Sequence, residues 1–365
     1  MFTDKAISIY VEVAGLDEGY VNNTDLVERI NRLGGVPLSK DREINVRYVK
    51  NPPGGTSNSL TLATDGHVIF SAGNFAGFAT GKPGRGILSY DPANESWTDL
   101  SPEGLGRVTC MDYSEGTLWV GTHENGLWQG DARGNQWRQI TQTDGLPGMT
   151  ISAVTADRTG AYVGVGIDRG GLVRMERDGS IDVMEGDGAP VKAPADIVVY
   201  EDSLFVSSRT IVREMNLKTR QWKPLGRASY CRVFGTESGV WGSFDSHQLF
   251  RMDELKAALQ AEYERPGKRT ERKVDGFIPS LRSLAFKDGQ FKDSWYPRGE
   301  RRASYHVRFA VEWEDGVWFG GSPYSRFQSA GLYRCHMKDG RFTAFSPHDG
   351  FRTRTTYRTS DAVPL

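Results

Sequence analysis

The sequence predicts an all-β protein, and three observations carry that prediction. Glycine and aromatic residues are abundant, with 43 Gly, 9 Trp and 14 Tyr among 365 residues. Short runs of alternating apolar and polar residues lie between turn-forming residues, a pattern typical of half-buried strands. These runs also repeat at intervals of roughly 40 residues, so the chain consists of similar strand units in series.

The clearest unit covers residues 107–148 and contains four short strands. The expected strands are Val108–Tyr113, Thr117–Thr122, Leu127–Asp131 and Gln136–Thr141. Turns containing Gly and Asn separate them, and these residues adopt positive φ at low cost. Four antiparallel strands of this length make one small sheet.

Three features of this unit recur along the chain. The core of the second strand appears as Ile69–Ser71, Trp119–Gly121, Tyr162–Gly164, Phe205–Ser207, Trp241–Ser243 and Trp318–Gly320. The third strand appears as GILSYD, GLWQGD, GLVRME, TIVREM, HQLFRM and GLYRCH, beginning at Gly86, Gly126, Gly171, Thr210, His247 and Gly331. An acidic residue followed by Gly closes the units at Glu103, Asp144, Asp187, Asp275 and Asp349.

A four-stranded sheet of this size cannot bury both of its faces alone. Stacking such sheets around an axis buries each face against a neighbour, so the repeat predicts a β-propeller. The units cover about 57–106, 107–148, 149–189, 190–227, 228–277 and 306–351. The same packing predicts that six tryptophans lie between blades: Trp97, Trp119, Trp128, Trp137, Trp222 and Trp318.

The termini bear on the number of blades. Residues 1–56 form an N-terminal extension with two strand-like runs, Ala6–Ala14 and Ile44–Lys50, and a capped helix over Thr24–Leu33. Residues 352–365 add a further strand-like stretch. Strands from both ends would close the ring without a free edge, as propellers require. We therefore expect seven blades, with six blades and terminal extensions as the alternative.

One segment, residues 251–305, breaks the period and reads as an insertion in the propeller of residues 57–351. A short polar helix is expected over Leu255–Arg265. Two basic runs follow, GKRTERK at 267–273 and YPRGERR at 296–302. They are either a site for an anionic partner or the solvated charges of an insertion loop.

Composition narrows the classes of function. The 45 Lys and Arg residues balance 46 Asp and Glu residues, so overall charge gives no reason to expect a nucleic-acid partner. We expect no membrane-spanning segment and see no signal peptide. The protein would be cytoplasmic if the chain is full length, and periplasmic or extracellular if it is a fragment of a secreted sensor. Three distant cysteines without a CxxC pair are expected to be buried strand residues.

Two units resemble a known family. The pattern LWVGT followed by DGLPG in residues 107–148 resembles the two-component regulator propeller repeat of bacterial sensor proteins, and residues 307–351 match it with a longer loop. Residues 86–100 are also similar to a kelch-type strand pair. The resemblance implies a sensory or ligand-binding propeller, and the motif itself carries no chemistry.

The expected binding surface is the top face, defined as the end carrying the loops between second and third strands and the connections between units. Two of these loops are long, Asn74–Arg85 and Ser322–Ala330, and uneven loops on a rigid scaffold usually carry binding. Arginines there suit carboxylate or phosphate groups. The predicted ligand-binding residues are Phe78, Lys82, Arg85, His123, Glu124, Asp168, Arg169, Arg209, Asp245, His247, Tyr324 and Arg326.

Three functions remain open at this point. The first is a non-enzymatic module that binds a small molecule, glycan or protein at the top face, possessing neither cofactor nor metal. The second is a propeller lyase or glycoside-active hydrolase using Glu124, Asp168, His123 or His247 as acid and base. The third is a structural or assembly component. The first is favoured because no GxSxG, HExxH or phosphate-loop motif is present.

Overall fold

The protein is all-β over the residues that the computed structural model describes, as the sequence predicts. These residues are 57–62, 68–72, 86–91, 93–94, 96–166, 170–190, 193–208, 210–227, 231–244, 248–253, 305–313, 316–323, 332–336 and 342–345. Their elements are strands β1–β23 and one short 3-10 helix, η2 (Gln142–Asp144). The expected helices over Thr24–Leu33 and Leu255–Arg265, and the terminal strands, lie outside the described residues.

The strands form six antiparallel sheets, numbered here in chain order. Sheet 1 contains β1 (Ser57–Leu62), β2 (Val68–Ala72), β3 (Gly86–Asp91) and β4 (Ser96–Asp99). Sheet 2 contains β5 (Arg107–Ser114), β6 (Thr117–His123), β7 (Leu127–Asp131) and β8 (Arg138–Ile140). Sheet 3 contains β9 (Ile151–Ala156), β10 (Gly160–Gly166), β11 (Gly170–Glu176) and β12 (Ile181–Val183).

The second half of the chain repeats the arrangement. Sheet 4 contains β13 (Asp196–Tyr200), β14 (Ser203–Ser208), β15 (Ile211–Asn216) and β16 (Trp222–Arg227). Sheet 5 contains three strands within the described residues, β17 (Cys231–Thr236), β18 (Gly239–Phe244) and β19 (Gln248–Arg251). Sheet 6 contains β20 (Tyr305–Trp313), β21 (Gly316–Pro323), β22 (Leu332–His336) and β23 (Phe342–Phe345).

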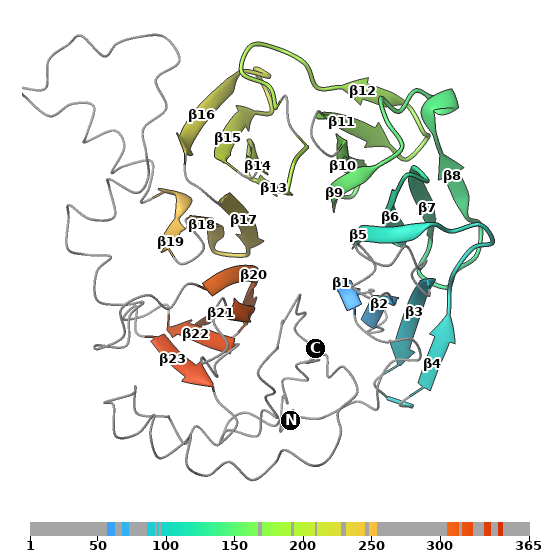
Figure 1. Ribbon diagram of the computed structural model, residues 1–365, viewed down its shortest axis with the longest axis horizontal. Helices are drawn as coiled ribbons and strands as arrows, with labels where there is room; N and C mark the ends of the chain where they lie inside the picture. Colours follow the sequence, from blue (N-terminus) through green and yellow to red (C-terminus); the bar gives the residue numbers. More distant parts are fainter. Residues whose placement is uncertain are drawn as a thin grey trace, which may run out of the picture.

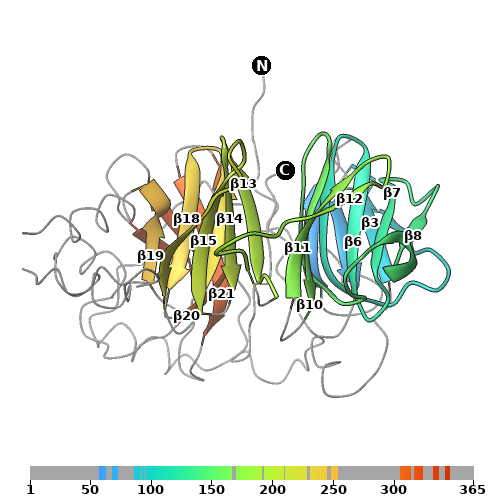
Figure 2. The same cartoon turned by 90° about the horizontal axis from the view of Figure 1, so that it is seen from above.

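The sheets follow one another around a common axis in chain order (Figure 1), and a view at right angles shows the strands along their length (Figure 2). In every sheet the first strand lies nearest the axis and each later strand lies further out. All the repeated second-strand cores of the sequence lie in second strands, from Ile69–Ser71 in β2 to Trp318–Gly320 in β21. The strand order expected for residues 107–148 is therefore confirmed and extends to the other units.

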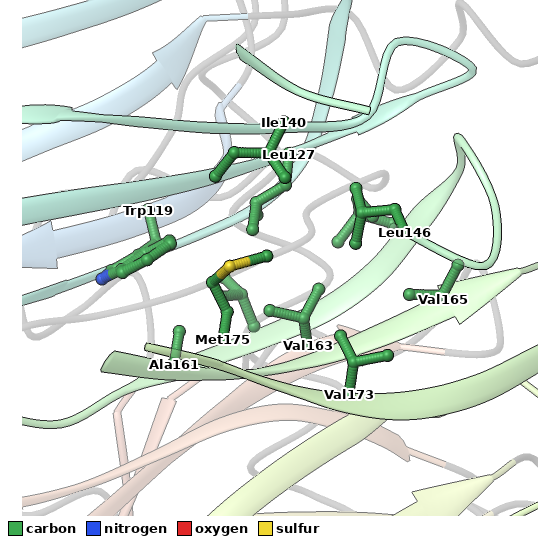
Figure 3. Close-up of a cluster of buried hydrophobic side chains, with 11 residues drawn as sticks. Trp119, Leu127, Ile140, Leu146, Ala161, Val163, Val165, Val173 and Met175 are labelled. Carbon is green, nitrogen blue, oxygen red and sulfur yellow. The ribbon is translucent and has the colours of Figure 1, made fainter. Parts of the chain in front are cut away.

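The hydrophobic core is divided among the spaces between consecutive sheets, because the middle strands are apolar on both faces. On β6, Leu118 and Val120 pack with Ile69 and Ile87 of sheet 1, whereas Trp119 points the other way. Trp119 packs with sheet 3 residues that include Val163, Val173 and Met175, as Figure 3 shows. Corresponding clusters join sheet 3 to sheet 4 and sheet 4 to sheet 5. In sheets 1 to 5 the apolar side chains are thus buried against neighbouring sheets.

Most of the predicted tryptophan positions lie in these spaces. Trp119, Trp128 and Trp222 belong to clusters formed by two sheets. The Trp137 indole Nε1 donates a hydrogen bond of 2.9 Å to the backbone oxygen of Leu100, which follows sheet 1. Trp318 is buried. Trp97 differs, because its ring lies 4.8 Å from the ring of Tyr90 in the same sheet.

Polar contacts also join neighbouring sheets near the axis. The Asp112 carboxylate of β5 accepts a 2.8 Å hydrogen bond from the Ala156 backbone N–H of β9. The Glu312 carboxylate of β20 accepts one of 2.6 Å from the Ser238 backbone N–H of sheet 5. These acids satisfy backbone donors that no strand within the same sheet reaches, so they tie consecutive sheets together.

Candidate functional site

The top face is the end of the sheets at which the innermost strands begin. Because each sheet is antiparallel and runs outward in strand order, its second-to-third loop and its connection to the next sheet lie at that end. Of the predicted binding residues, His123 and Glu124 are described, and both lie there, His123 as the last residue of β6 and Glu124 directly after it. The others lie outside the described residues: Phe78, Lys82, Arg85, Asp168, Arg169, Arg209, Asp245, His247, Tyr324 and Arg326.

The turn carrying His123 and Glu124 is held by contacts to both adjacent connections. The Asn125 side-chain amide donates a 2.6 Å hydrogen bond to the backbone oxygen of Gly104, in the connection from sheet 1. The Glu124 backbone N–H donates to the Thr150 hydroxyl, at 3.2 Å, in the connection to sheet 3. Glu124 adopts a positive φ of 65°, which a non-glycine residue adopts only when its surroundings hold it there. The turn is therefore a fixed platform on the top face.

The two predicted residues on this platform differ in exposure. The His123 side chain is 25% exposed and the Glu124 side chain 77%, and His123 Nδ1 lies 3.8 Å from Glu124 Oε2. Arg107, the first residue of β5, is the cross-strand partner of His123. The platform therefore offers a cationic residue, an imidazole and a carboxylate at one edge of the top face.

A second polar group at the top face was not predicted from the sequence. Asp196 begins β13 and forms an ion pair of 2.6 Å with Arg232 of β17. The Asp196 carboxylate also accepts hydrogen bonds from the Ser207 hydroxyl at 2.7 Å and the Val233 backbone N–H at 3.2 Å. Both charged side chains are mostly buried, at 13% and 18% exposure. Their positions at the start of innermost strands are the sequence signal that could have predicted this pair. A charged side chain buried there needs a partner, and the neighbouring sheet supplies it.

Two of the three cysteines, Cys110 and Cys231, offer no reactive thiol. Burial raises the pKa of the Cys110 thiol to about 12. The effect of burial is larger than the opposing effect of the hydrogen bonds with Thr109 and Gly121, which lower this pKa. At neutral pH the sulfur therefore stays protonated, and a protonated thiol is a poor nucleophile. Cys231 is also buried, in the core between sheets 4 and 5. The expectation that these two cysteines act as small apolar residues is confirmed.

The strongest charge network of the described residues lies at the opposite end, the bottom face of sheet 3. The Arg174 guanidinium donates two hydrogen bonds of 2.9 Å to the Asp157 carboxylate and one of 2.9 Å to Glu176. It also lies over the Tyr162 ring, 4.5 Å from the centroid. With Arg174 only 9% exposed and fully paired, the network locks the β9–β10 turn to β11 and leaves no donor for a ligand.

This network makes part of the stability dependent on pH. Burial by itself would raise the pKa of Asp157, but hydrogen bonds from Arg174 and Thr159 outweigh it and hold the pKa below its ordinary value. A carboxyl with a lowered pKa in the folded state contributes stability above its unfolded pKa, about 3.9, and loses it as pH falls through the folded value.

We expect Asp157→Asn to lower the free energy of unfolding at pH 7 by about 1 kcal/mol, because charged hydrogen bonds contribute roughly 1.5–3 kcal/mol and this carboxyl is 34% exposed. The difference from the unmodified protein should shrink as pH falls below about 3.9 and through the lowered folded pKa of Asp157. Urea unfolding at pH 7, 5 and 3 measures it. Glu185→Gln, in the exposed connection after β12, is the control and should leave stability unchanged at each pH. An equal loss at pH 7 and pH 3 would contradict the assignment.

The described residues also bear on membrane spanning and metal binding. They include no helix long and apolar enough to cross a bilayer. They also include no group of three His, Cys, Asp or Glu side chains arranged to hold a metal ion.

No family model matches the chain, and no curated protein matches it at a significant level. Solved structures do share its fold. The extracellular domain of a candidate one-component system protein from B. thetaiotaomicron is 12% identical, with a TM-score of 0.51 over 81% of this chain and 36% of that one. PorZ, a surface component of the type-IX secretion system of Porphyromonas gingivalis, is 9% identical, with a TM-score of 0.50 over 81% of this chain and 33% of that one.

A third structure, that of U3-55K, is 13% identical, with a TM-score of 0.53 over 82% of this chain and 83% of that one. At these identities the likeness concerns the fold alone. The chain spans about a third of the length of the first two proteins. The all-β architecture of successive sheets is thus shared with the extracellular domain of a one-component system protein, with PorZ and with U3-55K.

Proposed function

We propose that the protein is a non-enzymatic, sensory β-propeller that binds a small molecule, glycan or protein through its top face. The proposal includes a seventh blade built from residues 1–56 and 352–365, which would complete the ring. The observation that carries the binding role is the fixed turn at His123 and Glu124, which is held from both sides while the Glu124 carboxylate stays exposed. A rigid scaffold that presents polar side chains on short loops suits recognition.

The buried carboxylate of the described top face, Asp196, belongs to the scaffold and is not available as an acid or base. A general acid and base pair needs two titratable groups within reach of one substrate, with pKa values set apart by their surroundings. At the top face the carboxylate of Asp196 is already held by Arg232, Ser207 and a backbone N–H. Its lone pairs are occupied by structural partners, so it serves the scaffold. The shared fold with a sensor-type extracellular domain agrees with a sensory role.

The test is ligand-induced stabilisation of the full chain. Succinate, citrate, inorganic phosphate and oligogalacturonate are suitable probes, since Arg107 and His123 favour anionic groups. A ligand at 100 times its Kd should raise the free energy of unfolding by about 2.7 kcal/mol. We expect His123→Ala to weaken binding of the stabilising probe at least tenfold, measured by calorimetry.

Lys218→Ala is the matched control, because this exposed side chain lies in the β15–β16 turn at the bottom face. It should leave the affinity unchanged. Binding that survives His123→Ala but is lost in Lys218→Ala would place the site on the bottom face and contradict the proposal. Chemical conversion of a probe by the unmodified protein would overturn the non-enzymatic assignment.

A further inference from the structure

The residues from His123 to Gly126, which join β6 to β7, differ in what their polar groups contact. The Gly126 backbone N–H donates a 2.7 Å hydrogen bond to the Met149 backbone oxygen, and the Gly126 oxygen accepts one of 2.7 Å from the Thr122 hydroxyl. Thr122 is buried, so this second contact lies inside the sheet. The end of the turn is therefore joined to the scaffold, whereas its beginning carries the predicted binding residues.

Asn125 connects this turn to two other segments. Its side-chain amide donates a 2.6 Å hydrogen bond to the Gly104 backbone oxygen, in the connection from sheet 1. Gln139 Nε2 in turn donates to two oxygens of Asn125, the side-chain Oδ1 at 2.6 Å and the backbone oxygen at 3.1 Å. An amide nitrogen carries two hydrogens, so one Gln139 side chain satisfies both oxygens at once.

The contact from Gln139 comes from the outermost strand of the same sheet. Gln139 lies in β8, where its backbone pairs with Trp128 of β7. Asn125 precedes β7, so its backbone oxygen lies beyond the strand pairing and takes its donor from a side chain. An added Cβ at Gly106 would lie 2.7 Å from Asn125 Cβ, so the connection from sheet 1 also packs closely on this residue. Asn125 is thus held by sheet 2 and by the connection before it.

We propose that Gln139 is a positioning residue of the top-face site, because through Asn125 it fixes the turn that presents His123 and Glu124. It acts from within the scaffold and does not itself contact the ligand. This role rests on the proposed function, which assigns ligand binding to those two side chains. Gln139 is half-buried and is not among the residues predicted from the sequence.

The backbone at Glu124 explains why the turn needs such support. Its φ of 65° lies in the left-handed region, which costs free energy for a residue with a side chain and persists only when neighbouring contacts hold it. Asn125 is the next residue, so hydrogen bonds to its two oxygens restrict the chain directly after the strained position. The Thr150 hydroxyl, which accepts from the Glu124 backbone N–H at 3.2 Å, restricts the strained residue itself.

Loss of the Gln139 donor should weaken ligand binding because the turn is then less ordered before the ligand arrives. A turn that is already ordered binds without first losing conformational freedom. Fixing the backbone of one residue changes an equilibrium constant by about tenfold. A ligand that has to order the turn itself should therefore bind about tenfold more weakly.

The stability of sheet 2 should depend far less on this side chain. β8 pairs with β7 at each of its three residues, through the backbone. This pairing and the burial of Ile140 remain when the Gln139 amide is removed. A loss of affinity without a matching loss of global stability therefore separates a positioning role from a structural one.

Gln139→Met in the full chain tests the proposal, because methionine keeps the unbranched shape of glutamine and removes the donor. Calorimetric titration uses citrate, succinate, inorganic phosphate and oligogalacturonate as probes. We expect Gln139→Met to bind about tenfold more weakly than the unmodified chain. Amide hydrogen exchange at Glu124 and Gly126 should become about tenfold faster, while exchange in the middle of β6 should change far less.

A double-mutant cycle with Asn125→Ala tests whether Gln139 acts through Asn125. In the Asn125→Ala background the shorter of the two contacts is already lost, so Gln139→Met should lower the affinity further by about threefold or less. The matched control is Gln221→Met, an exposed glutamine in the β15–β16 turn at the bottom face. It should leave both the affinity and the exchange at Glu124 unchanged.

Two results would overturn the positioning role and leave the proposed function intact. One is an affinity of Gln139→Met within about twofold of the unmodified chain, while His123→Ala still binds about tenfold more weakly. The other is an undiminished effect of Gln139→Met, about tenfold, in the Asn125→Ala background. Failure of the proposed function is a different result, because the unmodified chain then binds none of the probes, and the positioning role is overturned with it.

Discussion

Trp119→Ala should lower the free energy of unfolding by about 3–5 kcal/mol, the loss measured when a large aromatic side chain is removed from a protein core. Trp119 is 0% exposed and fills the space between sheets 2 and 3. Its neighbours Val163 and Met175 belong to rigid strands of the facing sheet, so they cannot collapse far into the cavity. The loss should appear as a lower urea midpoint with an unchanged slope.

Trp97→Ala is the matched control for this substitution. Trp97 is half-buried and contacts Tyr90 within its own sheet, so its removal opens no space between sheets. We expect a loss of about 1 kcal/mol, the contribution of one aromatic pair. If both variants lost equal stability, the inter-sheet spaces would not be the main source of cohesion.

Gly121→Ala should lower the free energy of unfolding by about 1–3 kcal/mol, although it adds only one methyl group, because overpacking a close contact forces strands apart. A Cβ atom at Gly121 would lie 2.5 Å from Cys110 Sγ and 2.6 Å from Ile151 Cγ2. Ile151 begins β9 of the next sheet, so the clash falls between two sheets. Thermal and urea unfolding measure the loss.

The control is Gly171→Ala, in β11, where an added Cβ meets no atom within 4 Å. Replacing Gly by Ala at an unstrained position reduces the entropy of the unfolded chain and stabilises by about 0.4–1 kcal/mol. The two Gly→Ala changes should therefore have opposite signs. A destabilised Gly171→Ala variant would show that the strands resist any side chain, whatever the space.

Gly121 has counterparts in the other sheets. Gly164 holds the same place in β10, where an added Cβ would lie 2.9 Å from Pro194 of the connection to sheet 4. In β14 the place is taken by Ser207, which bonds to Asp196. Small residues therefore recur at the end of the second-strand core, and at Gly121 and Gly164 an added Cβ would meet the start of the next sheet or the connection leading to it.

The strands could be predicted because their signals are local. A short run with a continuous buried centre such as that of β6, bounded by Gly116 and Gly126 at positive φ, specifies strand and turn within one short window. The capping box of Thr141 and Asp144 similarly explains the sharp end of sheet 2. Predicted and observed strands in residues 107–148 differ only at their ends, where Gln136–Thr141 shortens to Arg138–Ile140.

The candidate site was only partly predictable, because its members meet through sheet stacking. Asp196 and Arg232 are 36 residues apart in the chain, and neither belongs to a recognisable motif. Their pairing requires the start of β13 to lie beside the start of β17, a relation set by the angle between two sheets. His123 was found from the sequence because it lies in a loop of a repeated unit, whose place on the top face follows from strand order.

The sequence by itself determined an all-β chain of repeated units, the order of strands within each unit and the end of each unit that carries His123. Periodicity and turn-forming residues act over a few neighbouring residues, so the linear sequence is enough to predict the strands and turns. Only the tertiary structure decided which charged side chains are buried in structural contacts and which are exposed. Asp112, Arg174 and Asp196 are bound by other residues of the scaffold, whereas the Glu124 side chain is exposed. Whether a charged side chain forms a structural ion pair depends on its neighbours in space, and for Asp112 and Asp196 the stacking of sheets brings those neighbours from another unit.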